Sequence, residues 1–401
     1  MHGRLARRLS AAVAGIAVSG LAVSGLAGVG VAAAGVAARG PARAARAVPV
    51  TAYVVNSGSR TVTPIRTATN KALRPIKVGA APDAIAITPN GKTAYVVNRG
   101  SGTVTPIRTA TNTALKPIKV GTNPDAIAIT PNGKTAYIAN GLSGTVTPIR
   151  TATNTALKPI KVGAGPAAIA ITPNGKTAYV VASGAGNTCG SGCTVVPIRT
   201  ATNTTLKPIP AGYVPGAIAI TPDGKTVYVA TFQLKPREVP VLLAIDTATN
   251  TIRTTIRTGT GPDDIVISPD GQTAYVANND NLYVTPFSTS TDKPGKNIGI
   301  GTYAAQIAIT PNGKTAYVTA ASSRQYPMSK VTPIQTATGT ALKAITVGRG
   351  PGTAIVITPN GKTAYVANYA SGTVTPIRTS TNTALKAVKV GTHPVAIALT
   401  P

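Results

Sequence analysis

The sequence predicts an all-β protein, a β-propeller built from four-stranded antiparallel blades. Three observations lead to this prediction. A unit of about 42 residues returns along the chain of 401 residues. Each unit holds four short runs rich in β-branched and aromatic residues, and no window keeps a helical period. A unit of this length with four strands is the size of one propeller blade.

The copies are counted from a Pro-Asn/Asp-Gly turn. It opens at Pro89, Pro131, Pro173, Pro222, Pro269, Pro311 and Pro359, at intervals of 42, 42, 49, 47, 42 and 48 residues, and an eighth copy stops at Pro401. Within one copy the expected strands are Ala84 to Thr88, Thr93 to Asn98, Thr103 to Thr109 and Leu115 to Val120. Asn90-Gly91 is expected to form the tight turn between the first two strands, because both residues tolerate positive φ.

Proline interrupts the outer half of each unit. Pro106 stands midway along the expected third strand, where its missing N–H removes a hydrogen bond. We expect that position to face a loosely paired fourth strand, which itself contains Pro117. The outer half of each blade should therefore be its weaker half.

The two ends of the repeat region complement each other. The region begins at a second strand, Thr51 to Asn56, and ends at a first strand, Ala396 to Thr400. Pairing of these strands would complete an eighth blade and remove two open sheet edges. The copy count favours eight blades, and a seven-bladed ring is the alternative.

Residues 1–47 stand outside the ring, and residues 48–401 form a single propeller domain. Arg4, Arg7 and Arg8 precede an uncharged run from Ala11 to Ala38, and small-residue cleavage sites follow. This outline is typical of a secretory signal peptide, and an uncleaved membrane anchor is the alternative. We expect a secreted, cell-surface or envelope protein that acts as a monomer.

The two cysteines agree with export. Cys189 and Cys193 flank a short glycine-rich segment in an enlarged loop between second and third strands. In an oxidising compartment we expect them to form a disulfide. A metal site would need two more ligands, and none lies nearby in the sequence.

Four segments carry a resemblance to a known family: Tyr95-Val96-Val97-Asn98, Tyr137-Ile138-Ala139-Asn140, Tyr275-Val276-Ala277-Asn278 and Tyr365-Val366-Ala367-Asn368. Each follows a Pro-Asn/Asp-Gly-Lys/Gln-Thr turn, and they resemble the YVTN-type bacterial β-propeller repeats. The resemblance extends over residues 51 to 401 and implies a propeller fold. It implies a surface or secreted binding protein as readily as an enzyme.

The largest departures from the repeat fall in one type of loop. Phe232 to Val239 and Ser322 to Lys330 enlarge the connection between second and third strands, as the cysteine segment does. In an antiparallel meander these loops share one face of the ring. Individual specificity is expected on that face, although tolerance of loop insertions explains the pattern equally well.

The chain is strongly basic. Its formal net charge is +29; removing residues 1–47 takes away six Arg and no acid, which leaves 33 basic and 10 acidic residues, or +23. The repeated basic residues flank the turns between strands one and two and between strands three and four, which should share the other face: Lys92, Lys134, Lys176, Lys225, Lys314, Lys362, Arg66, Arg108, Arg150, Arg199 and Arg378, with Lys116, Lys158, Lys207, Lys343 and Lys386 nearby.

A basic face of this kind attracts polyanions. The candidate partners are a cell-wall polymer, an acidic polysaccharide or nonspecifically bound nucleic acid, besides a surface protein. The alternative is that the charges keep the ring soluble and prevent edge pairing. The absence of Trp and the scarcity of Phe disfavour sequence-specific nucleic-acid binding, which uses aromatic stacking.

A second candidate site is the mouth of the central channel on the opposite face. Asp83, Asp125, Asp263 and Asp264 stand at the start of inner strands, and His393 precedes the inner strand of the closing blade. A cation or polar ligand could bind there. Alternatively, each Asp after Pro caps a turn by accepting backbone N–H groups.

Enzymatic function is disfavoured. Apart from His2, His393 is the only histidine, and Glu238 is the only glutamate. That leaves little for acid–base chemistry and excludes multi-histidine metal sites. No cofactor is expected. The sequence therefore predicts a non-enzymatic binding or scaffold propeller; the alternative is a hydrolase or lyase of the lactonase type that uses the acidic channel mouth.

Overall fold

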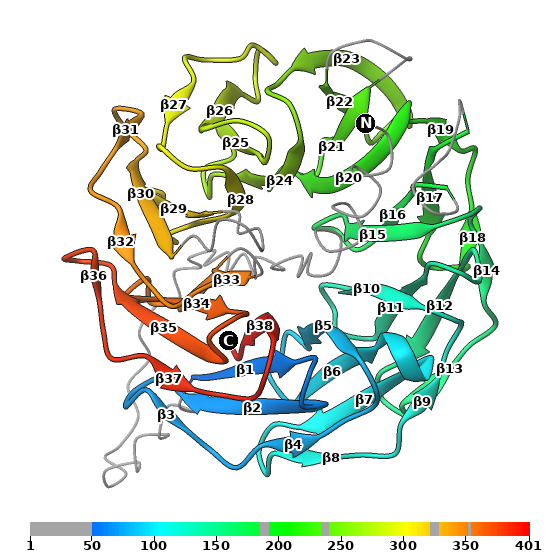
Figure 1. Ribbon diagram of the computed structural model, residues 1–401. Helices are drawn as coiled ribbons and strands as arrows, with labels where there is room; N and C mark the ends of the chain where they lie inside the picture. The colour runs from blue at the N-terminus through cyan, green and yellow to red at the C-terminus, as the bar shows by residue number, and fades with distance from the viewer. Residues whose placement is uncertain (1–49, 185–191, 234–239, 321–328, 352–353) are drawn as a thin grey trace, which may run out of the picture.

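The computed structural model describes residues 50–184, 192–233, 240–320, 329–351 and 354–401, which form a closed ring of eight β-sheets around a central axis (Figure 1). Each sheet is one antiparallel blade. Eight blades are thus confirmed over seven. The expected export segment, residues 1–47, and Cys189 lie outside the described residues. Within those ranges no helix has the length and apolar character that crossing a lipid bilayer requires.

Blades 1 to 8 are numbered around the ring, beginning with the blade that joins the two ends of the repeat region. Their innermost strands are β38 (Pro394–Leu399), β5 (Pro82–Ile87), β10 (Pro124–Ile129), β15 (Pro166–Ile171), β20 (Tyr213–Ile220), β24 (Pro262–Ile267), β28 (Ala304–Ile309) and β33 (Ala354–Ile357). Their second strands are β1 (Thr51–Asn56), β6 (Thr93–Asn98), β11 (Thr135–Asn140), β16 (Thr177–Ala182), β21 (Thr226–Gln233), β25 (Thr273–Asn278), β29 (Thr315–Ala320) and β34 (Thr363–Asn368).

The outer half of each blade holds a third strand and a short fourth segment. The third strands are β2 (Thr61–Arg66), β7 (Thr103–Arg108), β12 (Thr145–Arg150), β17 (Thr194–Arg199), β22 (Val241–Asp246), β26 (Tyr283–Ser288), β30 (Lys330–Gln335) and β35 (Thr373–Arg378). A 3-10 turn, η1 (Arg99–Ser101), follows β6. The long β20 and β21 extend the inner hairpin of blade 5, so Phe232 belongs to a strand and not to the expected loop.

The predicted four-stranded antiparallel blade is confirmed, but in six blades the fourth strand is not the continuous run that the sequence predicted. It consists of two short pieces: β3 (Lys71–Ala72) and β4 (Ile76–Lys77), β8 (Thr113–Ala114) and β9 (Ile118–Lys119), β13 (Thr155–Ala156) and β14 (Ile160–Lys161), β18 (Thr204–Thr205) and β19 (Ile209–Pro210), β31 (Thr340–Ala341) and β32 (Ile345–Thr346), and β36 (Thr383–Ala384) and β37 (Val388–Lys389). Blade 5 has a continuous fourth strand, β23 (Thr251–Arg257), and blade 6 has only β27 (Ile298–Gly299).

Proline in the third strand explains the split. The Pro106 carbonyl accepts a hydrogen bond from Leu115 N–H (2.8 Å), so the Pro106 nitrogen also faces the fourth strand and offers no donor there. The fourth strand pairs only at the two ends of β7, and the expected weak outer half is confirmed. Blade 5 is a natural control: Ala244 replaces this proline, and β22 pairs along its whole length with β23.

Head-to-tail closure is also confirmed. Strand β1 pairs with β38 in an antiparallel register from Ala52↔Leu399 to Val55↔Ala396. Thr400 N–H donates to the Thr51 carbonyl (3.0 Å). The first and last strands of the ring thus share one sheet, and the edge of β1 that would otherwise be open is paired.

The described residues contain eight apolar clusters, each of which fills the seam between two neighbouring blades. Ile85 packs toward Tyr53 and Val55 of blade 1, whereas Ala84 packs with Ile127 of blade 3. Large and small side chains therefore alternate on the inner strand, as expected. The hydrophobic core thus consists of separate clusters between neighbouring blades, arranged around the ring.

A hydrogen bond across the seam joins most blades, and the sequence analysis did not predict it. A buried tyrosine of the second strand donates its hydroxyl to a side-chain oxygen in the turn between strands three and four of the next blade. The pairs are Tyr53–Asn112, Tyr95–Asn154, Tyr137–Asn203, Tyr179–Asn250, Tyr228–Asp292, Tyr317–Asn382 and Tyr365–Asn70, at 2.5–2.7 Å.

These acceptors are held in position by backbone conformation. Asn112 has φ 53° and Asn154 has φ 54°, in the left-handed region that Asn tolerates better than most residues. Burial raises the pKa of Tyr95 to about 12, which keeps its hydroxyl a donor. For Tyr275 the acceptor position of the next blade is occupied by Gly339 (φ 62°), which has no side-chain acceptor, so the seam between blades 6 and 7 lacks this bond within the described chain.

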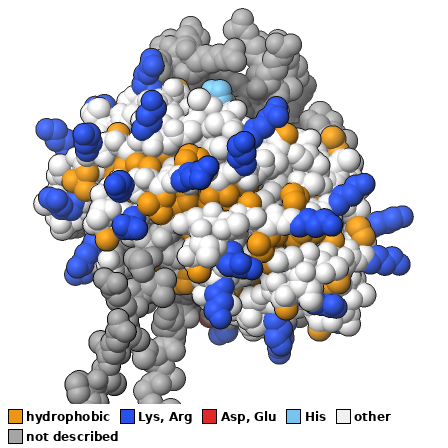
Figure 2. All heavy atoms as spheres, turned by 90° about the horizontal axis from the view of Figure 1, so that it is seen from below, with side chains coloured by type: hydrophobic (Ala, Val, Ile, Leu, Met, Phe, Trp, Pro, Cys, Tyr) orange, Lys and Arg blue, Asp and Glu red, His pale blue; other side chains and the backbone are white. Residues whose placement is uncertain are grey.

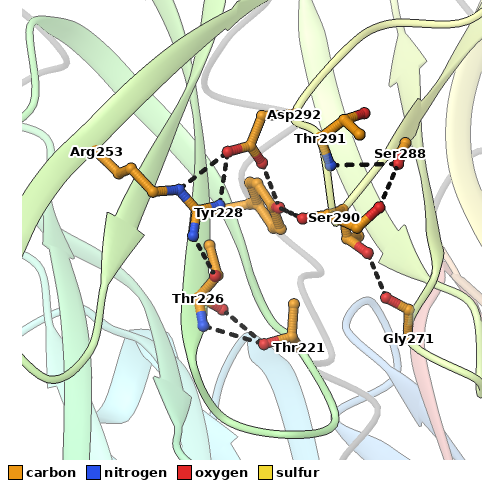
Figure 3. Close-up of polar contacts among 10 residues, drawn as sticks. Thr221, Thr226, Tyr228, Arg253, Gly271, Ser288, Ser290, Thr291 and Asp292 are labelled. Carbon is orange, nitrogen blue, oxygen red and sulfur yellow. Dashed lines mark hydrogen bonds and ion pairs between the residues drawn. The ribbon is translucent and has the colours of Figure 1, made fainter.

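The seam between blades 5 and 6 has a charged version of the contact (Figure 3). Tyr228 donates to Asp292 Oδ1 (2.7 Å), while Arg253 Nη2 lies 2.6 Å from Asp292 Oδ2. Arg253 belongs to the continuous strand β23. The substitution of Asp for Asn is thus compensated by a cation from the neighbouring blade.

Replacing Tyr95 with Phe should lower the free energy of unfolding by about 1 kcal/mol, because a buried hydrogen bond to Asn154 is lost while packing is kept. Urea denaturation followed by circular dichroism measures the change. Tyr275→Phe is the matched control and should be close to neutral, because its hydroxyl has no Asn partner. Equal losses for the two variants would contradict the role given to the contact.

Candidate functional site

Strand register defines two faces of the ring. Thr93 pairs with Arg108, and Thr109 N–H donates to the Lys92 carbonyl (3.1 Å), so the turns between strands one and two and between strands three and four lie together; we call this the turn face. Asn98 pairs with Thr103 at the other end of the blade, next to the connections between strands two and three; we call this the loop face.

The residues of the repeated motif have structural roles. Asn98 donates to Thr105 Oγ1 (2.8 Å) and accepts a hydrogen bond from Gly79 N–H (3.1 Å), which ties its blade to the preceding link. In the turn, Asn90 Oδ1 accepts from Thr88 Oγ1 and Lys92 N–H, and only Gly91 has positive φ (69°). Asn90 therefore does not adopt the left-handed conformation expected for it. These repeated Asn and Thr side chains are thus occupied by structural contacts.

Asp83 stands at the predicted channel mouth, in the irregular start of β5, and only 5% of its surface is exposed. Its Oδ2 atom is buried and has no hydrogen-bond partner. Burial raises the pKa of Asp83 to about 7, with a further increase from Asp125 and an opposing decrease from Arg99. A buried carboxyl group of this kind is a candidate for binding or for pH sensitivity.

Asp125 belongs to a polar network that connects blades 2 and 3. Arg99 Nε lies 3.0 Å from Asp125 Oδ1 and donates to Asn123 Oδ1 (2.8 Å). Asn123 Nδ2 in turn donates to both carboxylate oxygens of Asp125. Burial raises the pKa of Asp125 to about 6, and Arg99 opposes the increase. Gly141 leaves room for this carboxylate, because a Cβ there would collide with Asp125 Oδ2.

Asp263 and Asp264 are occupied by their own surroundings. Asp263 Oδ2 accepts from Asn279 Nδ2 (2.8 Å), whereas Asp264 accepts from Ile265 N–H and from Ile307 N–H of the next blade (2.9 and 2.8 Å). Burial raises the pKa of Asp263 to about 7 and that of Asp264 to about 6. The backbone N–H groups that Asp264 accepts fit the capping interpretation and also join two blades. Asp263 does not fit it, because its hydrogen bond comes from a side-chain amide.

His393 does not interact with the acids. Its ring stacks on Tyr369 of blade 8 with centroids 4.5 Å apart and planes 10° apart, and its carbonyl accepts from Ser57 N–H. No hydrogen bond or ion pair joins His393 to Asp83 in the described structure. The geometry therefore brings Asp83, Asp125 and Arg99 together but leaves His393 with an aromatic partner. Within the described ranges, no group of three or more His, Cys, Asp or Glu side chains could hold a metal ion.

The loop face also carries exposed apolar side chains that the sequence analysis did not single out. They are Leu142 (76% exposed), Leu282 (48%), Tyr303 (46%) and Tyr369 (39%). Each occupies a position that differs between blades: Tyr369 and Arg99, for example, both directly follow the Asn that ends the second strand. Comparison of equivalent positions would have revealed them. Of the enlarged loops, residues 185–191, 234–239 and 321–328 lie outside the described residues.

The structure places the predicted basic residues mainly on the turn face. Lys92 and its copies stand in the turns, and Arg108 and its copies end the third strands beside them. The prediction for the other basic group, Lys116 and its copies, is wrong, because these residues do not lie on the turn face. Leu115 bonds to Pro106 in the middle of β7, so Lys116 and its copies lie at mid-height on the outer rim. Other basic residues, such as Lys77 and Lys119, pair with the start of the third strand near the loop face.

The basic residues therefore cover both the turn face and the outer rim of the ring, and not the turn face alone. Figure 2 views the rim from the side, and Lys and Arg side chains project from it at all heights. The described ion pairs are Arg99–Asp125 and Arg253–Asp292, and neither involves the basic residues of the turn face. Cys193 is buried, but Cys189 lies outside the described residues, so the disulfide stays a prediction.

Comparisons with known proteins agree with the fold. Residues 93–321, more than half of the chain, match the family described as YNCE-like beta-propeller. No curated protein matches the chain. Hydrazine synthase of Kuenenia stuttgartiensis is 25% identical, with a TM-score of 0.60 over 75% of this chain and 96% of that one.

Other solved structures are similar at lower identity. Dihydro-heme d1 dehydrogenase NirN gives a TM-score of 0.73 at 14% identity, over 87% of this chain and 74% of that one. AztD from Citrobacter koseri gives 0.65 at 12% identity, over 88% and 97%. Proteins of varied roles thus share this fold, and the fold does not select one role.

Between pH 4 and pH 7 folded Asp83 keeps a proton that the unfolded chain has lost, since the ordinary pKa of Asp is about 3.9. Stability should therefore fall as pH rises through this range. Asp83→Asn should flatten the dependence of the melting temperature on pH between 5 and 8. Asp223→Asn is the control: Asp223 has a lowered pKa, and other blades carry Asn at its turn position. Identical pH profiles for Asp83→Asn and the unaltered protein would contradict the assignment.

Proposed function

The chain belongs to the YNCE-like β-propeller family, and from that premise we propose that it is an exported, non-enzymatic binding or scaffold protein whose basic surface engages anionic polymers. One observation carries this proposal. The repeated Lys and Arg side chains of the turn face are exposed, occur in blade after blade, and form neither of the described ion pairs. A surface of this kind raises the local concentration of polyanions and speeds their association.

The physical setting supports a rigid scaffold. Repeated seams fix the blades, so the cationic side chains are presented at regular positions and lose little backbone entropy on binding. Export rests on the sequence of residues 1–47 and belongs to the proposal. The candidate partners are a cell-wall polymer, an acidic polysaccharide or nonspecific nucleic acid; the exposed apolar residues of the loop face suit a surface protein as a second partner.

The hydrolase or lyase alternative receives little support from the site. It would use Asp83, Asp125 or Asp264 together with His393. In the structure His393 stacks on Tyr369, and Asp264 accepts two backbone N–H groups. Asp125 is paired with Arg99. No acid and base within hydrogen-bond reach of each other are present among these residues.

Retention on a heparin column should decrease steeply as salt rises, because the interaction is electrostatic. Replacing Arg66, Lys362 and Arg378 with Gln removes three turn-face charges and should lower the salt concentration of elution. Replacing Lys77, Lys119 and Lys161 with Gln removes three charges near the loop face and should have a smaller effect. Salt-insensitive retention of the unaltered protein, or no retention at low salt, would overturn the proposal.

A further inference from the structure

The acidic residues are confined to one part of the ring. All ten lie between Asp83 and Asp292 in the sequence, so neither the stretch from 50 to 82 nor the stretch from 293 to 401 contains an acid. These two stretches supply blades 7, 8 and 1 with all of their strands, and the three blades are consecutive in the ring (Figure 1). One sector of the propeller therefore has only cationic side chains among its ionised groups.

A groove lies near the middle of this acid-free sector, on the outer rim where blade 8 meets blade 1. It lies between β3 and β37, and its volume is about 490 Å³. Three lysines line it, Lys71 from one side and Lys386 and Lys389 from the other, together with Thr69 and Asn70. All three lysines are exposed.

The floor of the groove is fixed by the inter-blade contact. Tyr365 donates its hydroxyl to Asn70 Oδ1 at 2.5 Å, which holds the Asn70 side chain and leaves its amide NH₂ group as a donor. The Thr69 hydroxyl adds another donor at the same turn. The site therefore combines three ammonium groups with neutral donors on a turn of fixed conformation, φ 52° at Asn70.

Three seams have a fourth segment that supplies two lysines, those after blades 2, 3 and 8, and two differences set this seam apart from the other two. Lys71 stands in the facing turn, where the other two seams have Thr155 and Thr204, so among these three seams only this one gains a third lysine. Blade 6 also has a lysine at this turn position, Lys293, but it faces a fourth strand of blade 5 that contains no lysine. Ala387 stands where blades 2 and 3 have Pro117 and Pro159, which removes a ring from the wall. Lys71 and Ala387 both line the groove, so both differences change the same site.

We infer that this groove is a site for the phosphate groups of a linear anionic polymer, which it binds through the backbone of the polymer alone. Lysine ammonium groups and hydroxyl and amide donors suit tetrahedral phosphate oxygens. No aromatic side chain lines the groove on which a base or sugar ring could stack. The inference rests on the proposed polyanion binding and locates it at one seam.

The test compares two variants of equal net charge. One replaces Lys71, Lys386 and Lys389 with Ala; the other replaces Lys116, Lys119 and Lys158, which lie on the rim of blades 2 and 3, with Ala. Inorganic polyphosphate is the probe, titrated at fixed salt by isothermal calorimetry. The groove variant should bind about tenfold more weakly than the unaltered protein, and the control variant should lose much less.

A third variant changes shape without changing charge. Ala387→Pro restores the ring found at Pro117 and should weaken polyphosphate binding, while the fold tolerates it because other blades have Pro there. Equal losses in the two triple variants would overturn the groove and leave general polyanion binding intact. Single-stranded DNA binding far tighter than polyphosphate binding would overturn recognition of the backbone alone. Failure of both polyphosphate and heparin to bind the unaltered protein would reject the proposed function itself.

Discussion

A tyrosine hydroxyl that crosses from one blade to the next is the contact on which the ring depends. The phenol ring fills the apolar seam, and its oxygen reaches a side-chain acceptor at a left-handed turn residue, as in Tyr95–Asn154. Tyrosine thereby provides the packing and the donor, and asparagine provides the turn conformation and the acceptor. The contact Tyr365–Asn70 continues the pattern at the seam between blades 8 and 1 and joins two residues that are 295 positions apart in the sequence.

The same contact explains why the repeat varies so little. At seven of the eight seams of the described ring, one blade offers a tyrosine and the next blade an acceptor, so a change on one side of such a seam favours a change on the other. Asp292 in place of Asn is accompanied by Arg253, and that cation comes from the continuous fourth strand that Ala244 permits. Structural demands thus occupy the repeated Tyr and Asn, whereas the repeated Lys and Arg of the turn face stay exposed, and residues such as Lys71 that differ between blades distinguish one seam from the others.

Most of the fold could be predicted from the sequence because the length of the repeat, its turn residues and its incomplete first and last copies are all visible there. The fourth strand was predicted in part: Pro106 was expected to face it and to weaken its pairing, but the two short pieces that remain paired at the ends of β7 follow from the register of the blade, which the sequence does not state. The candidate site was predicted less well. Asp83 and Asp125 were found from their place in the repeat, but the Arg99 contact and the stacking of His393 on Tyr369 depend on neighbouring blades that lie far away in sequence. The gathering of basic residues on one face was predicted from the sequence. The absence of acidic residues from three consecutive blades became evident only from the order of the blades in the ring.

Closure of the ring by a sheet shared between the two chain ends is the central claim, and amide hydrogen exchange of β38 tests it most directly. If β38 is the inner strand of a closed blade, its amides should exchange as slowly as those of β10, which occupies the same place in blade 3. Fast exchange of β38 at the rate of an unpaired segment, with β10 still protected, would show that the ends do not pair and that the ring is open.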